Sequence, residues 1–389
     1  MKLKGDKPVN AVELRNPKIN HILYVLLGIA IFSRIIMQQF TITNFMLFLL
    51  SIPVGLMVLI EFLNMIQSRR TVRQLTFYFF MFIVTLLCIK NSSAITFFFL
   101  VAFSSISLSI KGILKTYFYA VLCSIIVVIL IASFRFTTFF YQGIVTLGFL
   151  NPNTLGFYIA LLSLIYMYLR WDFMNWKDWM LMIVIVLFCF KYLLDYTAVF
   201  MIAGMLLLNL VIRGIPFLSK SLIIKMLVII VPLALTMLTF WLGENYGRFN
   251  FISEVNQVTS MRPQIWHYYL MNYPIKPFGQ LLNDNFLFIM NGQTVFDGTY
   301  LIFPLEHGWV IFGLFVILTT VSLRKLIKVN NWALISVYLM LLFSGFSENC
   351  LMNYYQSPLF LLVVAVIFSS FSAKKIFVFN QDEITATLK

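Results

Sequence analysis

The chain has 389 residues, 61% of them hydrophobic and 11% charged, with a formal net charge of +14. Soluble proteins carry about 25% charged residues, so this composition argues against a water-soluble domain. The apolar residues are spread along the whole chain, and a bilayer-crossing helix needs about 20 of them in a run. We therefore predict an all-α fold, a single polytopic membrane helix bundle over residues 1–389.

Polar residues 1–18 open the chain. This stretch is too long for the charged region of a signal peptide and has no small-residue cleavage site near it, so we predict a cytoplasmic tail. Residues 373–389 are predicted to form a second cytoplasmic tail. About twelve transmembrane helices are predicted between the tails, at residues 19–37, 45–65, 75–89, 94–110, 117–134, 155–169, 179–192, 197–212, 223–242, 299–323, 332–346 and 358–371.

Lysine and arginine predict the orientation, because they are enriched in the cytoplasmic loops of membrane proteins. With a cytoplasmic N-terminus, most of the 28 basic residues fall on the inner side. Both termini are therefore predicted inside. The positive charge then acts as an orientation signal, and no nucleic-acid partner is expected. The basic residues left on or near the outer side are Arg34, Lys90, Arg135, Lys191, Arg248, Arg262 and Lys276.

The outer connections are predicted to carry the functional site. Residues 135–153 and, above all, 243–298 form the long connections, the second between the ninth and tenth predicted helices. Long loops are uncommon and usually functional. Half of the 14 acidic residues also lie outside or at outer helix ends, Asp297 and Glu348 among them. Charges of both signs at one face of an apolar bundle indicate a polar site.

Residues 261–280 of the long outer loop read MRPQIWHYYLMNYPIKPFGQ. We predict a short amphipathic helix lying at the membrane surface and ended by a turn at 274–279. Its aromatic residues, Trp266 included, suit a membrane interface or stacking on sugars. The planar fork of Arg262 is suited to bonding phosphate oxygens in pairs. The alternative is a structural arginine that snorkels to the interface or pairs with Glu254.

Two further outer segments have both a functional and a structural interpretation. In GFLNPNTLGFY, residues 148–158, Asn151 and Asn153 offer amide donors at a helix N-terminus, although helix capping explains most of the pattern. In KYLLDY, residues 191–196, the charged residues Lys191 and Asp195 are expected to pair with each other across a tight turn.

Carboxylates at the outer mouth of the bundle are candidate bases. In FDGTYLIFPLEHGWVIFG, residues 296–313, Asp297 precedes a predicted helix, where it is either a cap or a base for a hydroxyl group. Glu348 lies at the outer end of the eleventh predicted helix, and His267 lies in the long loop. Both are rivals of Asp297 for the role of base.

Neither a metal nor a cofactor is expected. The histidines His21, His267 and His307 show no spacing typical of metal ligands. The chain also has no phosphate-binding glycine-rich loop with a lysine and no serine nucleophile elbow. ATP-driven transport therefore finds no support in the sequence.

Taken together, these segments resemble the Wzy-type polysaccharide polymerases, which form a wider superfamily with the O-antigen ligases. The resemblance covers the architecture: about a dozen spans, cytoplasmic termini and one dominant outer loop between late spans. It also covers local motifs of the family. A segment containing asparagine begins a middle span, a run of Arg, Trp, Pro and Phe-Gly lies in the long loop, and a polar residue followed by Tyr begins the span after the loop. The ligases usually have a histidine where this chain has Asp297, which favours the polymerase.

The resemblance implies glycosyl transfer on the outer face of the bacterial cytoplasmic membrane, in the synthesis of a capsule, O-antigen or exopolysaccharide. The substrates would be two undecaprenyl-pyrophosphate-linked oligosaccharides. Implied partners are membrane lipid, a flippase and a chain-length regulator. Arg262 would stabilise the leaving pyrophosphate, and Asp297 would deprotonate the attacking hydroxyl, with Glu348 and His267 as rivals. The residues expected to bind substrate are Arg248, Lys276, Tyr300, Asn151, Asn153, Arg135 and Trp266, and Arg248 also rivals Arg262 for the pyrophosphate.

Three other functions stay open. A polysaccharide ligase belongs to the same superfamily. A lipid-linked oligosaccharide flippase also has about twelve spans, but transporters tend to show internal repeats and broken paired helices, and the halves of this chain are unlike. A purely structural membrane scaffold is opposed by the ionisable residues of the outer loops.

Overall fold

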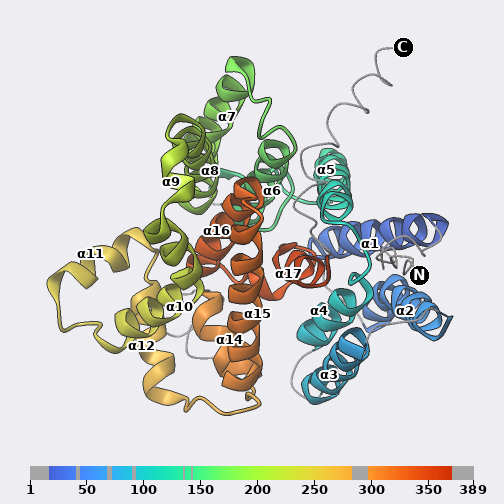
Figure 1. Cartoon of the computed structure of the whole chain (residues 1–389). Coiled ribbons are helices and arrows are strands. Elements are labelled where there is room, and N and C mark those ends of the chain that lie inside the picture. The colour runs from blue at the N-terminus through green and yellow to red at the C-terminus, as the bar shows by residue number, and fades with distance from the viewer. Residues whose placement is uncertain are drawn as a thin grey trace, which may run out of the picture.

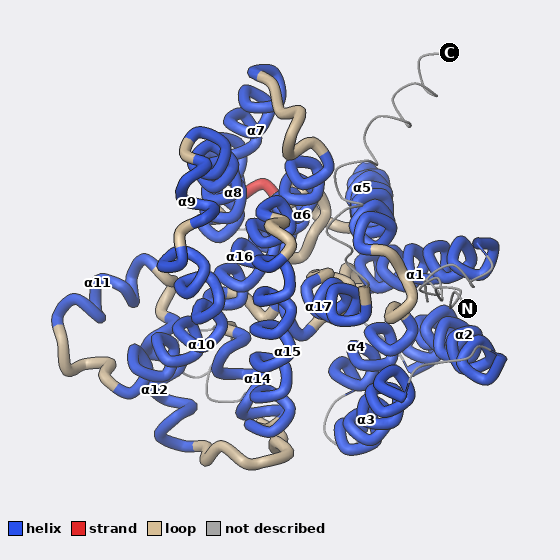
Figure 2. Tube along the Cα trace, in the orientation of Figure 1, coloured by secondary structure: helices blue, strands red, loops and turns tan. Residues whose placement is uncertain are grey.

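The computed structural model describes residues 17–40, 44–67, 72–89, 93–134, 136–141, 143–282 and 297–369. Seven helices of this described part are long and apolar enough to cross a membrane, and three shorter apolar helices accompany them. Helices account for most of it, and the strands form one small hairpin, Phe140–Tyr141 with Ile144–Val145 (Figure 2). The prediction of an all-α polytopic membrane bundle is confirmed. The predicted tails lie outside the described residues, apart from 17 and 18, which begin the first helix.

The first five helices gather on one side of the molecule, on the right in Figure 1. Within this group α1 packs against α5 and α2, and α4 packs against α2 and α3. The contact between α1 and α5 is close because Gly112 of α5 leaves room for Tyr24 of α1; a Cβ at Gly112 would lie 2.3 Å from the Tyr24 hydroxyl oxygen. The helices are α1 (Pro17–Met37), α2 (Asn44–Gln67), α3 (Val72–Ile89), α4 (Ser93–Ser104) and α5 (Ile110–Ser133).

The middle of the chain forms the second group, at the top of Figure 1. Here α8 packs against α6 and α7, and a π-helical turn, η1, joins α7 to α8. These elements are α6 (Pro152–Leu169), α7 (Trp176–Phe188), η1 (Cys189–Leu193), α8 (Tyr196–Gly214) and α9 (Pro216–Lys220).

The third group contains the described residues of the long connection predicted to face outward, 243–298, and the helices on either side of it. It comprises α10 (Leu222–Glu244), α11 (Asn250–Val258), α12 (Arg262–Asn272), α14 (Thr299–His307) and α15 (Trp309–Lys328). The helix predicted after residue 261 is confirmed as α12, whose position at the membrane surface stays a prediction. It packs against α10 and buries Ile265, Trp266 and Tyr269, because large rings stabilise more when they fill a core.

The centre of the bundle is formed by two short helices, α16 (Trp332–Ser347) and α17 (Leu359–Phe368), joined through a 3₁₀ turn, η2 (Cys350–Met352). Nearly all of their residues are buried. With ten residues, α17 is about 15 Å long, half of the roughly 30 Å hydrocarbon core of a bilayer. It is surrounded by α4, α5 and α15 rather than by lipid.

The tenth predicted helix, 299–323, is wrong in one respect, because it is two helices. α14 and α15 meet at Gly308, whose φ of 93° only glycine adopts readily. The turn predicted at 274–279 folds back against this break. Trp309 N–H donates to Lys276 O over 3.2 Å, and Gln280 N–H donates to Glu306 O over 3.1 Å. A Cβ at Gly308 would lie 2.1 Å from Pro277 O, so the two backbones touch only because this position lacks a side chain.

Candidate functional site

Four connections of the bundle bring ionisable side chains to one place. Asp195 caps the start of α8, Arg262 begins α12, Asp297 precedes α14, and Glu348 ends α16. In Figure 1, α16 lies between α8 on one side and α12 and α14 on the other. All four residues lie outside the apolar segments that could cross the membrane. Sequence reasoning selected three of them, and the structure brings those three together.

Arg262 is held at the centre of this site by hydrogen bonds to the protein. Two consecutive left-handed residues, Ser260 and Met261, turn the chain into α12, and the Arg262 side chain is buried. Its Nε donates to the carbonyl oxygen of Ser347, and Nη1 donates to Thr259 O over 2.8 Å. Nη2 lies 3.3 Å from both Asp297 Oδ2 and Glu348 Oε1. Four contacts thus occupy a group that has five N–H donors.

Glu348 and Asp297 share this arginine but differ in their other neighbours. Glu348 Oε1 also accepts a hydrogen bond from Thr197 Oγ1 over 3.4 Å, whereas the carbonyl oxygen of Asp297 accepts one from Trp266 Nε1 over 2.9 Å. The Asp297 side chain is 24% exposed and that of Glu348 is 18% exposed. Both side chains therefore keep some solvent-exposed surface.

Asp195 is a member of the site that sequence reasoning missed. It was expected to pair with Lys191, but in the described structure Oδ1 accepts from Ala198 N–H over 3.1 Å, and Oδ2 is buried without a hydrogen-bond partner. A Cβ on Gly156 would lie 2.2 Å from that Oδ2, so the glycine of LGFY on α6 makes room for the carboxyl group. The only available signal was an acidic residue at an outer helix end.

Burial controls the charge of the cluster. It raises the pKa of Asp195 to about 6, while Arg262 acts in the opposite direction. Burial, reinforced by neighbouring Asp297, raises the pKa of Glu348 to about 8. Burial also raises the pKa of Asp297, and Arg262 opposes the rise. A pKa of about 8 keeps Glu348 mostly protonated at neutral pH, and Asp297 is the more exposed of the two carboxyl groups.

This arrangement has a definite chemical capacity. An ionised carboxylate can accept a proton, and a protonated carboxyl group beside it can donate one, so the pair provides both halves of acid–base chemistry. Arg262 fixes the orientation of both groups and occupies the place between them that a cation would take. Within the described residues, no group of three His, Cys, Asp or Glu side chains has the arrangement of a metal site.

Comparisons with known proteins identify no relative. No family model, curated protein or solved structure matches the chain. What the chain does must therefore be argued from its own residues.

Several other predicted residues have structural roles. Asn151 caps α6, since its Oδ1 accepts from Asn153 N–H over 2.8 Å, so the capping interpretation holds for that residue. Tyr300 is buried and donates to Leu342 O over 2.9 Å. Trp266 is fully buried, so its ring has no free face for a sugar; its indole N–H instead orients Asp297.

The remaining predicted residues lie apart from the carboxyl groups or outside the described part. His267 Nδ1 lies 2.8 Å from Gly243 O, on the α10 side of α12, so His267 is not beside Asp297. Arg248 is exposed in the turn before α11, with Nη1 3.5 Å from Asn245 Oδ1. Lys276 is also exposed. Arg135 falls outside the described residues.

Proposed function

We propose that this chain polymerises undecaprenyl-pyrophosphate-linked oligosaccharide repeat units by glycosyl transfer on the outer face of the cytoplasmic membrane. The proposal rests on one observation above all. Two carboxyl groups, Asp297 and Glu348, share one buried arginine at the end of the helix bundle, outside the spanning segments. The resemblance of the segments around these residues to Wzy-type polymerases adds support.

In the proposed reaction, a hydroxyl oxygen of one lipid-linked sugar attacks the anomeric carbon of the other. The bond between that carbon and the pyrophosphate oxygen breaks, and its electron pair stays on the pyrophosphate. The hydroxyl proton passes to Asp297, the more exposed of the two carboxyl groups, which acts as the base. Glu348, protonated at neutral pH, adds no second negative charge beside Asp297. A sugar hydroxyl is recognised well by such paired donors and acceptors.

Arg262 acts in this proposal as a positioning residue rather than as the clamp for pyrophosphate. Its guanidinium is already bonded to two carboxyl groups and two carbonyl oxygens, and these acceptors would repel a pyrophosphate. Arg248 is exposed, and its guanidinium makes a long contact to Asn245 Oδ1 over 3.5 Å. Of the two arginines considered from the sequence, Arg248 is the better candidate for the leaving group.

The test is a complementation experiment in a strain that lacks the chain and loses its long surface polysaccharide. Asp297→Asn should leave single lipid-linked repeats on the outer leaflet and no polymer. Glu254→Gln, which changes an exposed carboxylate of α11 in the same loop, is the matched control and should restore polymer. Polymer of normal length from Asp297→Asn would disprove the assignment of the base.

A flippase is the second candidate, favoured by one observation. The chain breaks between α14 and α15 at Gly308, and discontinuous helices are common at transporter binding sites. The same experiment separates the two functions. A flippase variant would leave its single repeats on the inner leaflet, where an impermeant enzyme added outside the cell cannot reach them.

A further inference from the structure

Three aromatic side chains form an exposed patch where α10 leads into α11. Trp241 lies near the end of α10, and Phe249 and Phe251 lie at the start of α11. The Trp241 ring stacks on both phenylalanine rings, with centroid distances of 6.1 Å and 5.8 Å. These three residues, the aromatic patch, are nevertheless 42%, 46% and 47% exposed. An exposed cluster of large apolar side chains marks a surface that meets a membrane or a partner.

The aromatic patch continues the lipid-facing side of α10. Leu233, Met237 and Trp241 follow one another at intervals of four residues, so they share one side of this spanning helix, and all three are exposed. From its first residue, Leu222, to Trp241 the helix is about 30 Å long, which is the thickness of the hydrocarbon core of a bilayer. Trp241 therefore lies at the boundary between hydrocarbon and headgroups, where tryptophan is enriched. The two rings stacked on it lie at the same level.

Helix α11 has three distinct sides, each marked by two residues four positions apart. The first pair is buried, the second is apolar and exposed or half-buried, and the third is polar and exposed: Ile252 and Asn256, Phe251 and Val255, and Ser253 and Gln257. Because each residue advances about 100° around a helix, the apolar pair and the polar pair lie on nearly opposite sides. A helix that lies flat at a membrane interface has this division into an apolar and a polar face.

We propose that α11 docks on the surface of the bilayer at the end of α10, with the aromatic patch inserted at the headgroup boundary. The side of Ser253 then faces water, and the buried side faces the protein, where α11 packs against α12. Figure 1 shows α11 at the left edge of the molecule, which leaves it room to lie along a membrane. The partner of this surface is the bulk bilayer, because the patch is continuous with the side of α10 that already faces lipid.

Docking of α11 would fix the position of the Arg262 site relative to the membrane. The helix ends just before the turn that leads into Arg262, and Asn256 ties the two together. Its carbonyl oxygen accepts from Met261 N–H over 2.7 Å, and its Oδ1 accepts from Gln264 N–H over 3.0 Å. The site is thereby held beside the lipid headgroups. This role rests on the proposed function, in which lipid-linked sugars react there, but the docking of α11 does not.

The test is the quenching of tryptophan fluorescence by brominated lipid, and it requires no sugar transfer. The full-length protein, in a Trp241→Phe background, is placed in nanodiscs of phosphatidylcholine with and without bromine near the headgroup end of the acyl chains. Phe251→Trp should lose about half of its added emission or more, because an interfacial helix buries its apolar face about 5–10 Å deep. Ser253→Trp, on the polar side of the same helix, is the matched control and should lose little.

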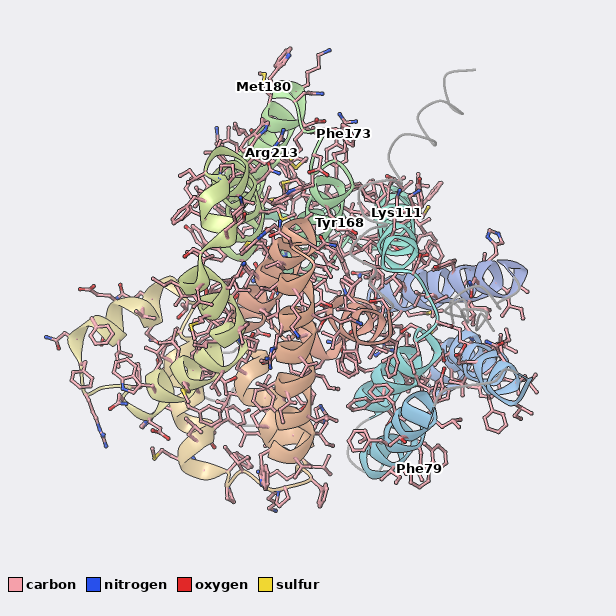
Figure 3. All side chains as sticks on the ribbon, in the orientation of Figure 1. Phe79, Lys111, Tyr168, Phe173, Met180 and Arg213 are labelled. Atoms are coloured by element: carbon pink, nitrogen blue, oxygen red, sulfur yellow. The ribbon has the colours of Figure 1, made fainter. Side chains whose placement is uncertain are left out.

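A tryptophan in α3 provides the reference for a ring in contact with lipid. Phe79 is exposed and lies at the periphery of the molecule (Figure 3), so Phe79→Trp should be quenched. Equal quenching of Phe251→Trp and Ser253→Trp would show that α11 turns no particular side to lipid and would overturn the proposal. Absence of quenching in Phe251→Trp would overturn it as well. Blue-shifted emission would then mean that protein covers the patch, and red-shifted emission that the patch faces water, as a platform for sugars would.

A further variant tests the link between α11 and the Arg262 site. Phe249→Ser combined with Phe251→Ser removes two rings of the patch and should lower polymer yield severalfold, whereas Gln257→Ala on the polar side should leave the yield unchanged. Wild-type yield from the double variant would overturn the positioning role of α11. The two proposals fail separately, because the quenching of Phe251→Trp is the same whether or not the chain makes polymer.

Discussion

Replacing Arg262 by alanine tests the central site most directly, because four hydrogen bonds converge on this side chain. Removing one partner of a buried ion pair costs about 3–5 kcal/mol, since the other partner stays buried without compensation. Glu348 is protonated at neutral pH, and the Asp297 side chain is 24% exposed. We therefore expect the lower end of that range, a loss of about 3 kcal/mol in the free energy of unfolding.

The assay is equilibrium unfolding of the purified protein in mixed micelles, with tryptophan fluorescence as the signal. A triple variant, Arg262→Met with Asp297→Asn and Glu348→Gln, provides the decisive comparison. Neutralising all members of a buried ionic cluster is often tolerated, so the triple variant should regain most of the lost stability while making no polymer. If it is as unstable as Arg262→Ala, the loss comes from packing and the electrostatic reasoning is refuted.

Three further predictions follow from the same geometry. Burial raises the pKa of Glu348 from an ordinary 4.5 to about 8. The stability that this group contributes is therefore complete below pH 4.5 and is lost as the pH rises through 8. The free energy of unfolding measured against pH should show this loss in the wild type and a flatter curve in Glu348→Gln. Gly156→Ala places a Cβ 2.2 Å from Asp195 Oδ2, so it should cost about 1–3 kcal/mol in unfolding free energy and reduce polymer yield; wild-type values for both would disprove the contact. Gly308→Ala should lose at least as much stability in thermal unfolding as Gly156→Ala does, because its Cβ would meet backbone atoms. Gly313→Ala is the control and should melt as the wild type does, since a Cβ at Gly313 would have no atom within 4 Å.

Much of the architecture could be predicted because hydrophobic runs of about 20 residues have few alternatives to membrane helices. The break at Gly308 was missed, although Glu306 and His307 interrupt the apolar run just before it, since the sequence does not show the close approach of Pro277. The burial of the α12 rings was not predictable for a similar reason. Aromatic residues suit both a membrane interface and a core, and only the neighbouring α10 decides between them.

The candidate site was partly predictable for a different reason. Arg262, Asp297 and Glu348 stood out because charges are rare in this chain and these three lie at outer helix ends. Their mutual contacts join residues 86 positions apart, which no local pattern encodes. Asp195 was not predicted as a member of the site because the nearby Lys191 offered a simpler partner. Trp266 was expected to stack on sugars because the sequence does not say which face of a helix is covered.

The short helix α17 has a consequence for how this protein is made. At about 15 Å, it is too short to be held in the bilayer by its own hydrophobicity, and α4, α5 and α15 enclose it. All three of these helices leave the ribosome before α17 does. The space between these three helices is therefore filled only once α17 has been synthesised. A chain cut before residue 359 would leave uncovered the faces of α4, α5 and α15 that pack on α17.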